Sequence, residues 1–357
     1  MNRKQIYPIA QALIAALLFG ASAPLAKILL GNVEPVALAA FLYLGSGIGL
    51  LSLKTWQRFN QRLSNGEAQI KKSDFPWLLG AILAGGVAAP ITLLFSLQNT
   101  PAATASLLLN FESVATTLIA VLAFKESISR RAWWAVALIT LSSVFLSINL
   151  NANWGFSLGS LGIIAACILW GIDNNFTRNI SAKDPLMIVT IKGFGAGGFS
   201  LAMALILGNK IPAPGIVLGA LILGGLSYGI SIVLFIYAMR GLGAARTSAL
   251  FGTAPLAGML LSFILFREFP GWLFLVAFPL MIAGTLFLVN EEHEHEHVHE
   301  MIIHEHAHVH DDGHHDHLHT GDFAQKHSHL HRHDQVTHTH QHMPDLHHRH
   351  IHPPESH

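Results

Sequence analysis

Charged residues are scarce in this sequence of 357 residues. Asp, Glu, Lys and Arg make up only 12% of it, whereas soluble domains average about 25%. Hydrophobic residues account for 52%. This composition excludes an ordinary soluble domain and indicates a protein that lies in a membrane.

Cysteine is nearly absent, and histidine is missing from most of the chain. The single cysteine, Cys167, excludes an intramolecular disulfide and a cysteine-based metal framework. All 24 histidines lie between His293 and His357. Up to Asn290 the chain holds 18 basic and 8 acidic residues, and after it 3 basic and 13 acidic ones. The formal net charge of zero therefore conceals a basic core and an acidic, histidine-rich tail.

Long apolar runs recur along the core. A helix needs about 20 largely apolar residues to cross a bilayer. Ten segments meet this requirement: 7–30, 36–53, 75–97, 102–124, 132–150, 157–177, 185–207, 215–237, 244–266 and 271–289. The first is too long for the apolar part of a cleavable signal peptide. The sequence predicts an all-α integral membrane protein with ten transmembrane helices and the lipid bilayer as a partner.

Lys and Arg in the connections predict the orientation, because cytoplasmic loops carry an excess of these residues. With the N-terminus inside, 14 of them lie in cytoplasmic loops and two, Lys210 and Arg267, in outer loops. Ten spans then return the tail to the same side. We expect a multi-pass protein of the cell inner membrane with both termini in the cytoplasm.

The two halves of the core resemble each other. Residues 79–86 (LGAILAGG) match 218–225 (LGALILGG), and residues 104–108 fall opposite 246–250. Phe19-Gly20 matches Trp170-Gly171, and Lys125-Glu126 matches Arg267-Glu268. An odd number of spans in each half turns the second half upside down relative to the first. The sequence thus predicts two inverted five-helix repeats, an architecture used by alternating-access transporters.

These residues resemble the EamA family, the ten-helix branch of the drug/metabolite transporter superfamily. The shared features are the two five-helix halves, the aromatic-Gly pair in each first helix and the basic-Glu pair that ends each fourth helix. The resemblance covers about residues 8–289, as repeats 8–150 and 157–289. It implies export or exchange of small metabolites, often amino acids or drugs, by a transporter and not an enzyme. Phe19 stands where the family often has Trp, and the tail is outside the family pattern.

Glu112 lies near the middle of the fourth span, where a charge is costly. It would bind a proton, a cation or an ammonium group if it faces a cavity, or it is a carboxyl locked between helices. Helical spacing predicts one polar stripe on this span, formed by Ser106, Asn110, Ser113 and Thr117. The stripe either lines a substrate path or forms hydrogen bonds with other helices. Glu112 points away from that stripe and serves another neighbour, with Thr116 one turn on.

Further polar groups lie in spans six and seven. An ion pair between Asp173 and Lys192 would act as a structural lock or as an inner gate. The neighbouring Asn174 and Asn175 complete the candidate substrate path, with Trp170 and Tyr228 either stacking on a substrate or filling space. Proline residues at positions 24, 90 and 255 free backbone carbonyl groups within spans.

The tail, residues 290–357, is polar and is expected to be a disordered cytoplasmic segment. Histidine recurs there at alternate positions, which favours binding of Zn, Ni, Co or Cu. The predicted ligands are His293, His295, His297, His299, His304, His306, His308, His310, His327, His329, His331, His333, His338, His340 and His342. Alternatively the tail is a pH-responsive polyelectrolyte, since histidine titrates near pH 6.5.

Two transport functions and one non-transport function remain open. The first is export of a small-molecule substrate by alternating access, without a cofactor in the core. The second is export of a divalent transition metal that the tail collects or senses, and the third is a membrane-anchored metal store. The sequence points to no nucleic-acid partner and to no particular oligomeric state.

Overall fold

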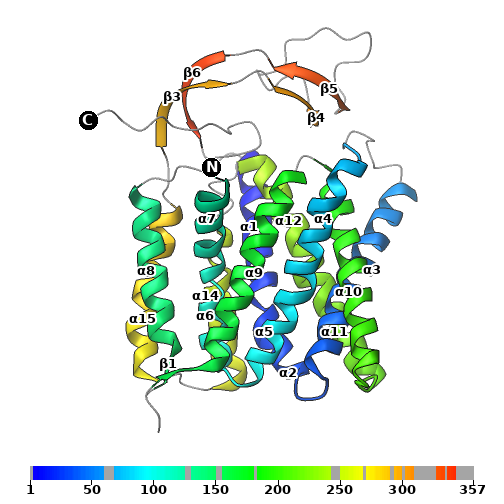
Figure 1. Cartoon of the computed structure of the whole chain (residues 1–357), viewed down its shortest axis with the longest axis vertical. Coiled ribbons are helices and arrows are strands. Elements are labelled where there is room, and N and C mark those ends of the chain that lie inside the picture. Colours follow the sequence, from blue (N-terminus) through cyan, green and yellow to red (C-terminus); the bar gives the residue numbers. More distant parts are fainter. Residues whose placement is uncertain are drawn as a thin grey trace.

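The computed structural model describes residues 3–59, 68–124, 130–149, 155–180, 183–242, 250–267, 271–289, 293–299, 302–308, 327–333 and 336–342. Up to residue 289 these residues form a bundle of helices that run along a common direction (Figure 1). Seven of the described helical stretches are long and apolar enough to cross a membrane: Tyr7–Leu29, Pro35–Trp56, Lys72–Gln98, Ala102–Phe124, Leu158–Ile180, Pro185–Ile206 and Pro214–Ala238. Three further helices lie in the bundle at the other predicted spans, so the all-α fold with ten spans is confirmed.

The first half begins with α1 (Arg3–Gly20), α2 (Ser22–Leu29) and α3 (Pro35–Phe59). Its third span consists of η1 (Lys72–Asp74), α4 (Phe75–Ala81), η2 (Ile82–Ala88) and α5 (Ala89–Gln98). Helices α6 (Ala102–Leu108), α7 (Phe111–Phe124) and α8 (Arg130–Ser147) complete it. Two short paired strands, β1 (Ile148–Asn149) and β2 (Gly155–Phe156), lie between the halves.

The second half consists of α9 (Leu158–Ile180), α10 (Pro185–Ile206), α11 (Pro214–Gly224), η3 (Gly225–Ile230), α12 (Ser231–Leu242), α14 (Ala254–Phe266) and α15 (Trp272–Val289). Helices α10 and α11 both begin with proline. The first residue of a helix has no intrahelical partner for its N–H group, so proline, which lacks that group, loses no hydrogen bond there. The carboxylate of Asp184 caps α10 by accepting hydrogen bonds from the backbone N–H groups of Leu186 and Met187.

Matching interruptions occur in the two halves. The third and eighth spans both change from α-helix to π-helix, at η2 and η3, beside the Gly-Gly pairs that end the 79–86 and 218–225 motifs. The fourth and ninth spans both break, where Asn110 N–H bonds Leu107 O and Thr253 N–H bonds Leu250 O. The two halves therefore share not only sequence motifs but also the positions at which their helices are irregular. In transporters, broken helices mark binding regions.

The glycines of the aromatic-Gly pairs lie at equivalent helix crossings. A Cβ atom at Gly20 would overlap the backbone of Ala254 in α14, and one at Gly171 would meet the backbone of Ala115 and Thr116 in α7. Each pair thus lets the first span of one half approach the fourth span of the other half closely. Small residues at such crossings permit dispersion contacts between backbones in a membrane.

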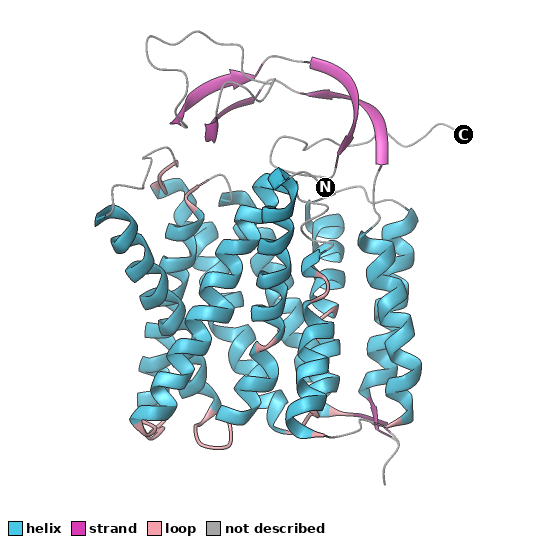
Figure 2. Cartoon of the chain, turned by 180° about the vertical axis from the view of Figure 1, so that it is seen from behind, coloured by secondary structure: helices cyan, strands magenta, loops and turns pink. Residues whose placement is uncertain are grey.

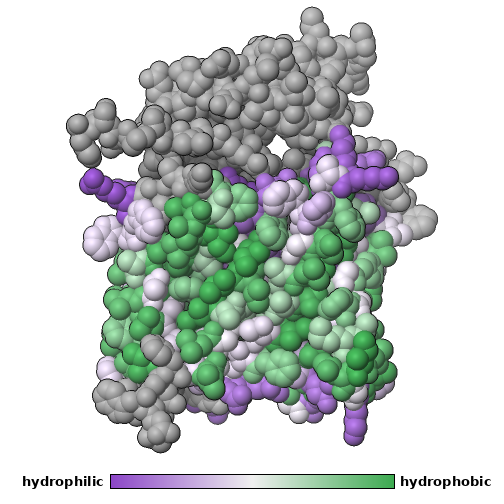
Figure 3. Space-filling view, viewed as in Figure 1, coloured by the Kyte–Doolittle hydropathy of each residue, from purple (hydrophilic) through white to green (hydrophobic). Residues whose placement is uncertain are grey.

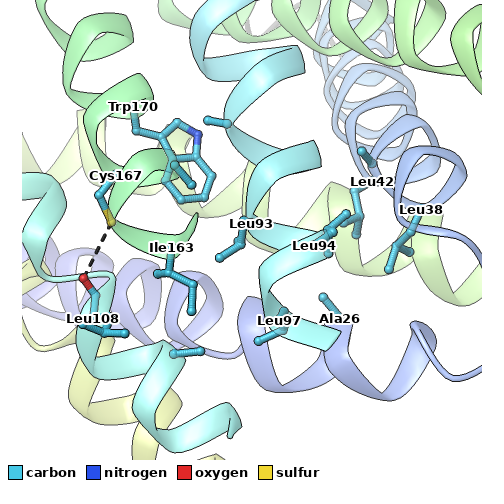
Figure 4. Close-up of a cluster of buried hydrophobic side chains, with 14 of the residues drawn as sticks. Ala26, Leu38, Leu42, Leu93, Leu94, Leu97, Leu108, Ile163, Cys167 and Trp170 are labelled. Carbon is cyan, nitrogen blue, oxygen red and sulfur yellow. Dashed lines mark hydrogen bonds between the residues drawn. The ribbon is translucent and has the colours of Figure 1, made fainter. Parts of the chain in front are cut away.

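Apolar side chains fill the space between the halves. In Figure 4, Ile163, Cys167 and Trp170 of α9 lie near Leu93, Leu94 and Leu97 of α5, with Leu38 and Leu42 of α3 beyond them. The buried thiol of Cys167 donates to the carbonyl oxygen of Leu108 at 3.6 Å. The lone cysteine is thus a packed core residue.

The outer surface of the bundle is apolar between two polar ends (Figure 3). Large side chains on it are highly exposed, including Leu122, Leu158 and Ile206 at 78–86% of their areas. Such a belt suits the hydrocarbon of a bilayer, where exposure of apolar groups costs nothing. The protein is a multi-pass membrane protein with lipid as its surroundings.

Four segments of the tail are β-strands. They are β3 (His293–His299), β4 (Ile302–His308), β5 (His327–His333) and β6 (Val336–His342), in the antiparallel pairs β3–β6 and β4–β5. They lie beyond the end of the bundle where the N-terminus lies (Figures 1 and 2). Histidine alternates in these strands mostly with polar residues such as Glu, Ser and Thr.

Candidate functional site

A carboxyl group and an amide join the two halves at membrane depth. Asn174 of α9 donates from Nδ2 to Glu112 Oε1 of α7 at 2.8 Å and to Thr116 Oγ1 at 3.1 Å. Glu112 is half-buried, whereas Asn174 is exposed. Glu112 and Thr116, one turn apart on α7, thus share Asn174 as a partner. The partner amide is neutral, so this hydrogen bond leaves the carboxyl charge uncompensated.

The ion pair expected between spans six and seven forms. Lys192 Nζ of α10 lies 2.6 Å from Asp173 Oδ1 and 2.8 Å from Oδ2, and both side chains are largely buried. Thr177 Oγ1 donates to Asp173 Oδ1 at 2.8 Å, one turn along α9. Buried charges need such pairing and hydrogen bonds to offset lost hydration. Asp173 is thus held by Lys192 and Thr177, whereas Glu112 accepts from an amide.

One backbone carbonyl organises the centre of the site. The hydroxyl of Tyr43 donates to Gly85 O at 2.7 Å, and Trp170 Nε1 donates to the same oxygen at 3.0 Å. In the π-helix η2, Ala89 N–H bonds Ala84 O, five residues earlier. The next bond of that pattern would join residue 90 to Gly85 O, but Pro90 has no N–H. Two side chains therefore occupy the carbonyl that the proline frees, and three spans meet at Gly85.

Aromatic rings extend from this point across the bundle. Tyr228 of η3 lies 5.5 Å from the Tyr43 ring and 6.1 Å from Phe19, and Phe19 lies 5.3 Å from Phe251. Ser22 hydrogen-bonds the Tyr228 hydroxyl. Trp170 and Tyr228 thus have partners in the protein, and the ring series connects spans one, two, eight and nine.

The four polar residues of span four do not form one continuous stripe. The break between α6 and α7 divides them, with Ser106 before it, Asn110 at it, and Ser113 and Thr117 after it. Asn110 Nδ2 donates to Thr285 Oγ1 of α15 at 2.7 Å, and Ser113 Oγ donates to Asn110 O. Ser106 lies against Gly258 of α14. The expected spacing assumed an unbroken helix. The bond from Asn110 to Thr285 joins two helices, whereas the bond from Ser113 to Asn110 lies within span four.

Asn175 also joins spans. Its Nδ2 donates to Gly171 O within α9 at 2.8 Å and to Thr116 O of α7 at 3.1 Å, and its side chain is buried. It therefore supports the contact on which Asn174 and Glu112 depend. Among Asn174 and Asn175, the first is the accessible amide and the second is the packed one.

Fourteen of the fifteen histidines predicted as metal ligands lie on the four tail strands, and His310 lies outside the described residues. Among the residues whose side chains the structure describes, no group of three or more His, Cys, Asp or Glu residues is placed to hold a metal ion. The structure therefore shows the positions of these histidines along the strands.

Tyr43, Gly85 and Thr177 belong to the site but were not expected from sequence. Tyr43 carries a signal, because it is one of four tyrosines and lies in an apolar span where its hydroxyl needs a partner. Gly85 was identified from sequence only as part of the repeated 79–86 motif. Its carbonyl oxygen accepts hydrogen bonds from Tyr43 and Trp170 because the helix is π-helical there. Thr177 follows Asp173 by four residues, the spacing at which helical side chains meet.

The architecture and the polar groups between its halves define a class of protein. Ten spans in two inverted halves, with ionisable residues at membrane depth where the halves meet, are those of a multi-pass membrane transporter. More specifically, the chain belongs to the EamA-like transporter family, whose sequence pattern matches residues 6–148 and again 157–290. The family belongs to the drug/metabolite transporter superfamily, as the sequence resemblance implied.

Relatives agree with this assignment. A protein of Methanothermobacter thermautotrophicus named "uncharacterized transporter" is 31% identical over 278 residues, which cover 74% of this chain and 81% of that protein. A probable 4-amino-4-deoxy-L-arabinose-phosphoundecaprenol flippase subunit, ArnE, of Pectobacterium atrosepticum is 35% identical over 104 residues, or 29% of this chain and 89% of that protein. A solved structure titled "Crystal structure of protein" has the same fold, with a TM-score of 0.56 at 18% identity over 78% of this chain and 95% of its own.

Proposed function

We propose that this chain is a secondary-active transporter of the cell inner membrane, with both termini cytoplasmic, which exports a small metabolite, amino acid or drug by alternating access. The hydrogen bond from Asn174 to Glu112 carries the proposal. It places a carboxyl group between two inverted halves that can rock against each other. Ionisable groups within spans mark substrate or proton pathways, because they are costly anywhere else in the hydrocarbon.

The charges around Glu112 suggest what it binds. Lys192 compensates Asp173, so the three ionisable groups Glu112, Asp173 and Lys192 carry one uncompensated negative charge when all are ionised. A proton or the ammonium group of a substrate would offset it. Asn174 then positions the carboxyl group, and the Trp170 and Tyr43 rings bound to Gly85 O form an apolar side of the site.

Transport by the full chain in proteoliposomes tests the proposal. Amino acids and small amines would be screened for uptake and counterflow under an imposed pH gradient. Glu112→Gln keeps the shape of the side chain but removes its charge, so we expect it to lose gradient-driven transport. The matched control is Glu34→Gln, at an exposed position between α2 and α3. Equal activity of the two variants would exclude Glu112 as the binding carboxyl group.

The histidines of the tail favour a second candidate, a divalent transition-metal exporter with the tail as its collector or sensor. Metal accumulation and resistance would be compared in cells that express the full chain, a chain without residues 290–357, and Glu112→Gln. Loss of metal efflux in both variants would support the metal exporter. Loss in the tail deletion alone would support a metal store, and no response to metal at all would leave the metabolite exporter.

A further inference from the structure

The register of the tail strands aligns histidine with histidine. In β3–β6 the paired positions are His293 with His342, His295 with His340, and His297 with His338. In β4–β5 they are His304 with His331, His306 with His329, and His308 with His327. Twelve histidines therefore form six cross-strand pairs.

This alignment is specific to the register. Alternate positions of a strand share one face of a sheet, and a shift of one residue moves every side chain to the other face. The positions between the histidine pairs hold other residues, such as Glu294 opposite Gln341 and Glu296 opposite Thr339. A shift of one residue would therefore place each of these histidines opposite a residue of another type. Each sheet has one face on which histidines are concentrated.

Paired positions on such a face suit chelation. Directly opposite Cβ atoms lie about 4.5–5.5 Å apart, and diagonal neighbours about 7–8 Å apart, within reach of long side chains. Imidazole nitrogen is a preferred ligand of Zn²⁺, Ni²⁺ and Cu²⁺, and Zn²⁺ takes four ligands in a tetrahedron. Two neighbouring pairs, such as His295 with His340 and His297 with His338, supply four imidazoles from two strands.

The strands also need something to hold them together. Each sheet has only two strands. A two-stranded sheet is marginally stable in water, and these strands are mostly polar. Strand β3 pairs with a strand more than 30 residues later in the chain, so pairing also closes a loop at an entropic cost. An ion ligated from both strands would offset that cost, as structural metal ions do in small domains.

We propose that β3–β6 and β4–β5 each form a site for a divalent transition-metal ion, with Zn²⁺ as the probe, in which histidines paired across the two strands ligate the same ion. The sites lie outside the membrane core and do not depend on the transport function proposed above. Binding of the ion and pairing of the strands are one coupled equilibrium.

The test measures Zn²⁺ binding to the full chain, purified in detergent with an affinity tag free of histidine. The β4–β5 histidines are replaced by Asn, so that β3–β6 is the one paired set of histidines left among the described strands, and binding is followed by calorimetry and metal analysis. His295→Asn and His340→Asn are made singly and together. We expect each single change to weaken binding about tenfold or more, because the second imidazole otherwise binds intramolecularly. The loss of Zn²⁺ affinity in the double variant should be clearly smaller than the product of the two single-variant losses.

The control cycle combines His295→Asn with His319→Asn, a histidine outside the described strands. Here the two effects should multiply, because the residues would not share an ion. Multiplicative effects in both cycles, or Zn²⁺ bound in proportion to the number of histidines whatever their position, would overturn the paired site. Failure of the full chain to retain Zn²⁺ would do the same. All seven tryptophans precede the tail, so their fluorescence verifies that each variant keeps its membrane core.

Discussion

Gly85 lies so close to Asp173 that a methyl group on Gly85 would overlap the Asp173 carboxylate. The ion pair of Asp173 with Lys192 thus depends on the absence of a side chain in a neighbouring span. The same glycine presents its carbonyl to Tyr43 and Trp170. One residue without a side chain therefore positions both the charged and the aromatic part of the site.

Gly85→Ala should destabilise the protein, because the added methyl group must displace the paired carboxylate. Overpacking of this kind costs about 1–3 kcal/mol. Gly198→Ala is the control, since a Cβ atom there meets nothing within 4 Å and alanine favours a helix. Thermal unfolding in detergent and transport in proteoliposomes would be measured for both. Similar behaviour of the two variants would contradict the close contact.

Asp173→Asn and Lys192→Met should each destabilise the protein strongly, because each leaves one buried charge without its partner. Such losses reach about 3–5 kcal/mol in proteins. The double variant should recover much of the stability, since no charge remains unpaired. Its transport then separates the two roles expected of the pair. Normal transport by a stable double variant identifies a lock, and loss of transport identifies a gate.

Tyr43→Phe and Trp170→Phe should be mild singly and more costly together. Either donor alone satisfies Gly85 O, whereas loss of both leaves a buried carbonyl without a partner, at about 1–3 kcal/mol. Pro90→Ala restores a backbone N–H at the position that would bond this oxygen. It should therefore stabilise the double variant more than it stabilises the unaltered protein. An equal effect in the two backgrounds would show that Pro90 and the two side chains are unconnected.

Asp184→Ala should be more damaging than Lys54→Met. Asp184 accepts from two N–H groups at the start of α10 and also pairs with Lys54 at 2.9 Å. The cap contributes about 0.5–2 kcal/mol and a partly exposed ion pair about 0–1 kcal/mol. Unfolding temperatures of the two variants would be compared, and Asp184→Ala should unfold at the lower temperature. Asp184→Asn, which can still cap the helix, should fall near Lys54→Met.

The spans and the ion pair were predictable from the sequence. Apolar runs of sufficient length identify spans because the bilayer fixes that length. Asp173 lies eight residues before residue 181 and Lys192 eight residues after Asp184, so an antiparallel helix pair with a short connection brings them to one level. Contacts within such a helical hairpin follow from counting residues.

The contacts between distant spans were not predictable in this way. No periodicity relates Tyr43, Gly85 and Trp170, which come from three spans of two halves. Nor does the apolar, glycine-rich run 82–88 distinguish a π-helix from an α-helix, since both bury the same residues. The division of the span-four stripe has the same origin, because a break in a helix changes which face each residue occupies. In the tail, alternation of histidine indicated a shared face but not which segments would pair.

The inverted repeat is a repeat of backbone and not of charge. In the match of residues 104–108 to 246–250, Glu112 falls opposite Ala254, and in the match of Phe19-Gly20 to Trp170-Gly171, Asp173 falls opposite Ser22. A device with identical halves would have equal free energy when open to either side. In the alternating access proposed above, the two open forms would present different electrostatic surroundings to the same carboxyl group, so side chains and not topology would set their resting populations. In that case, exchange of residues between the halves would shift the preference without a new fold.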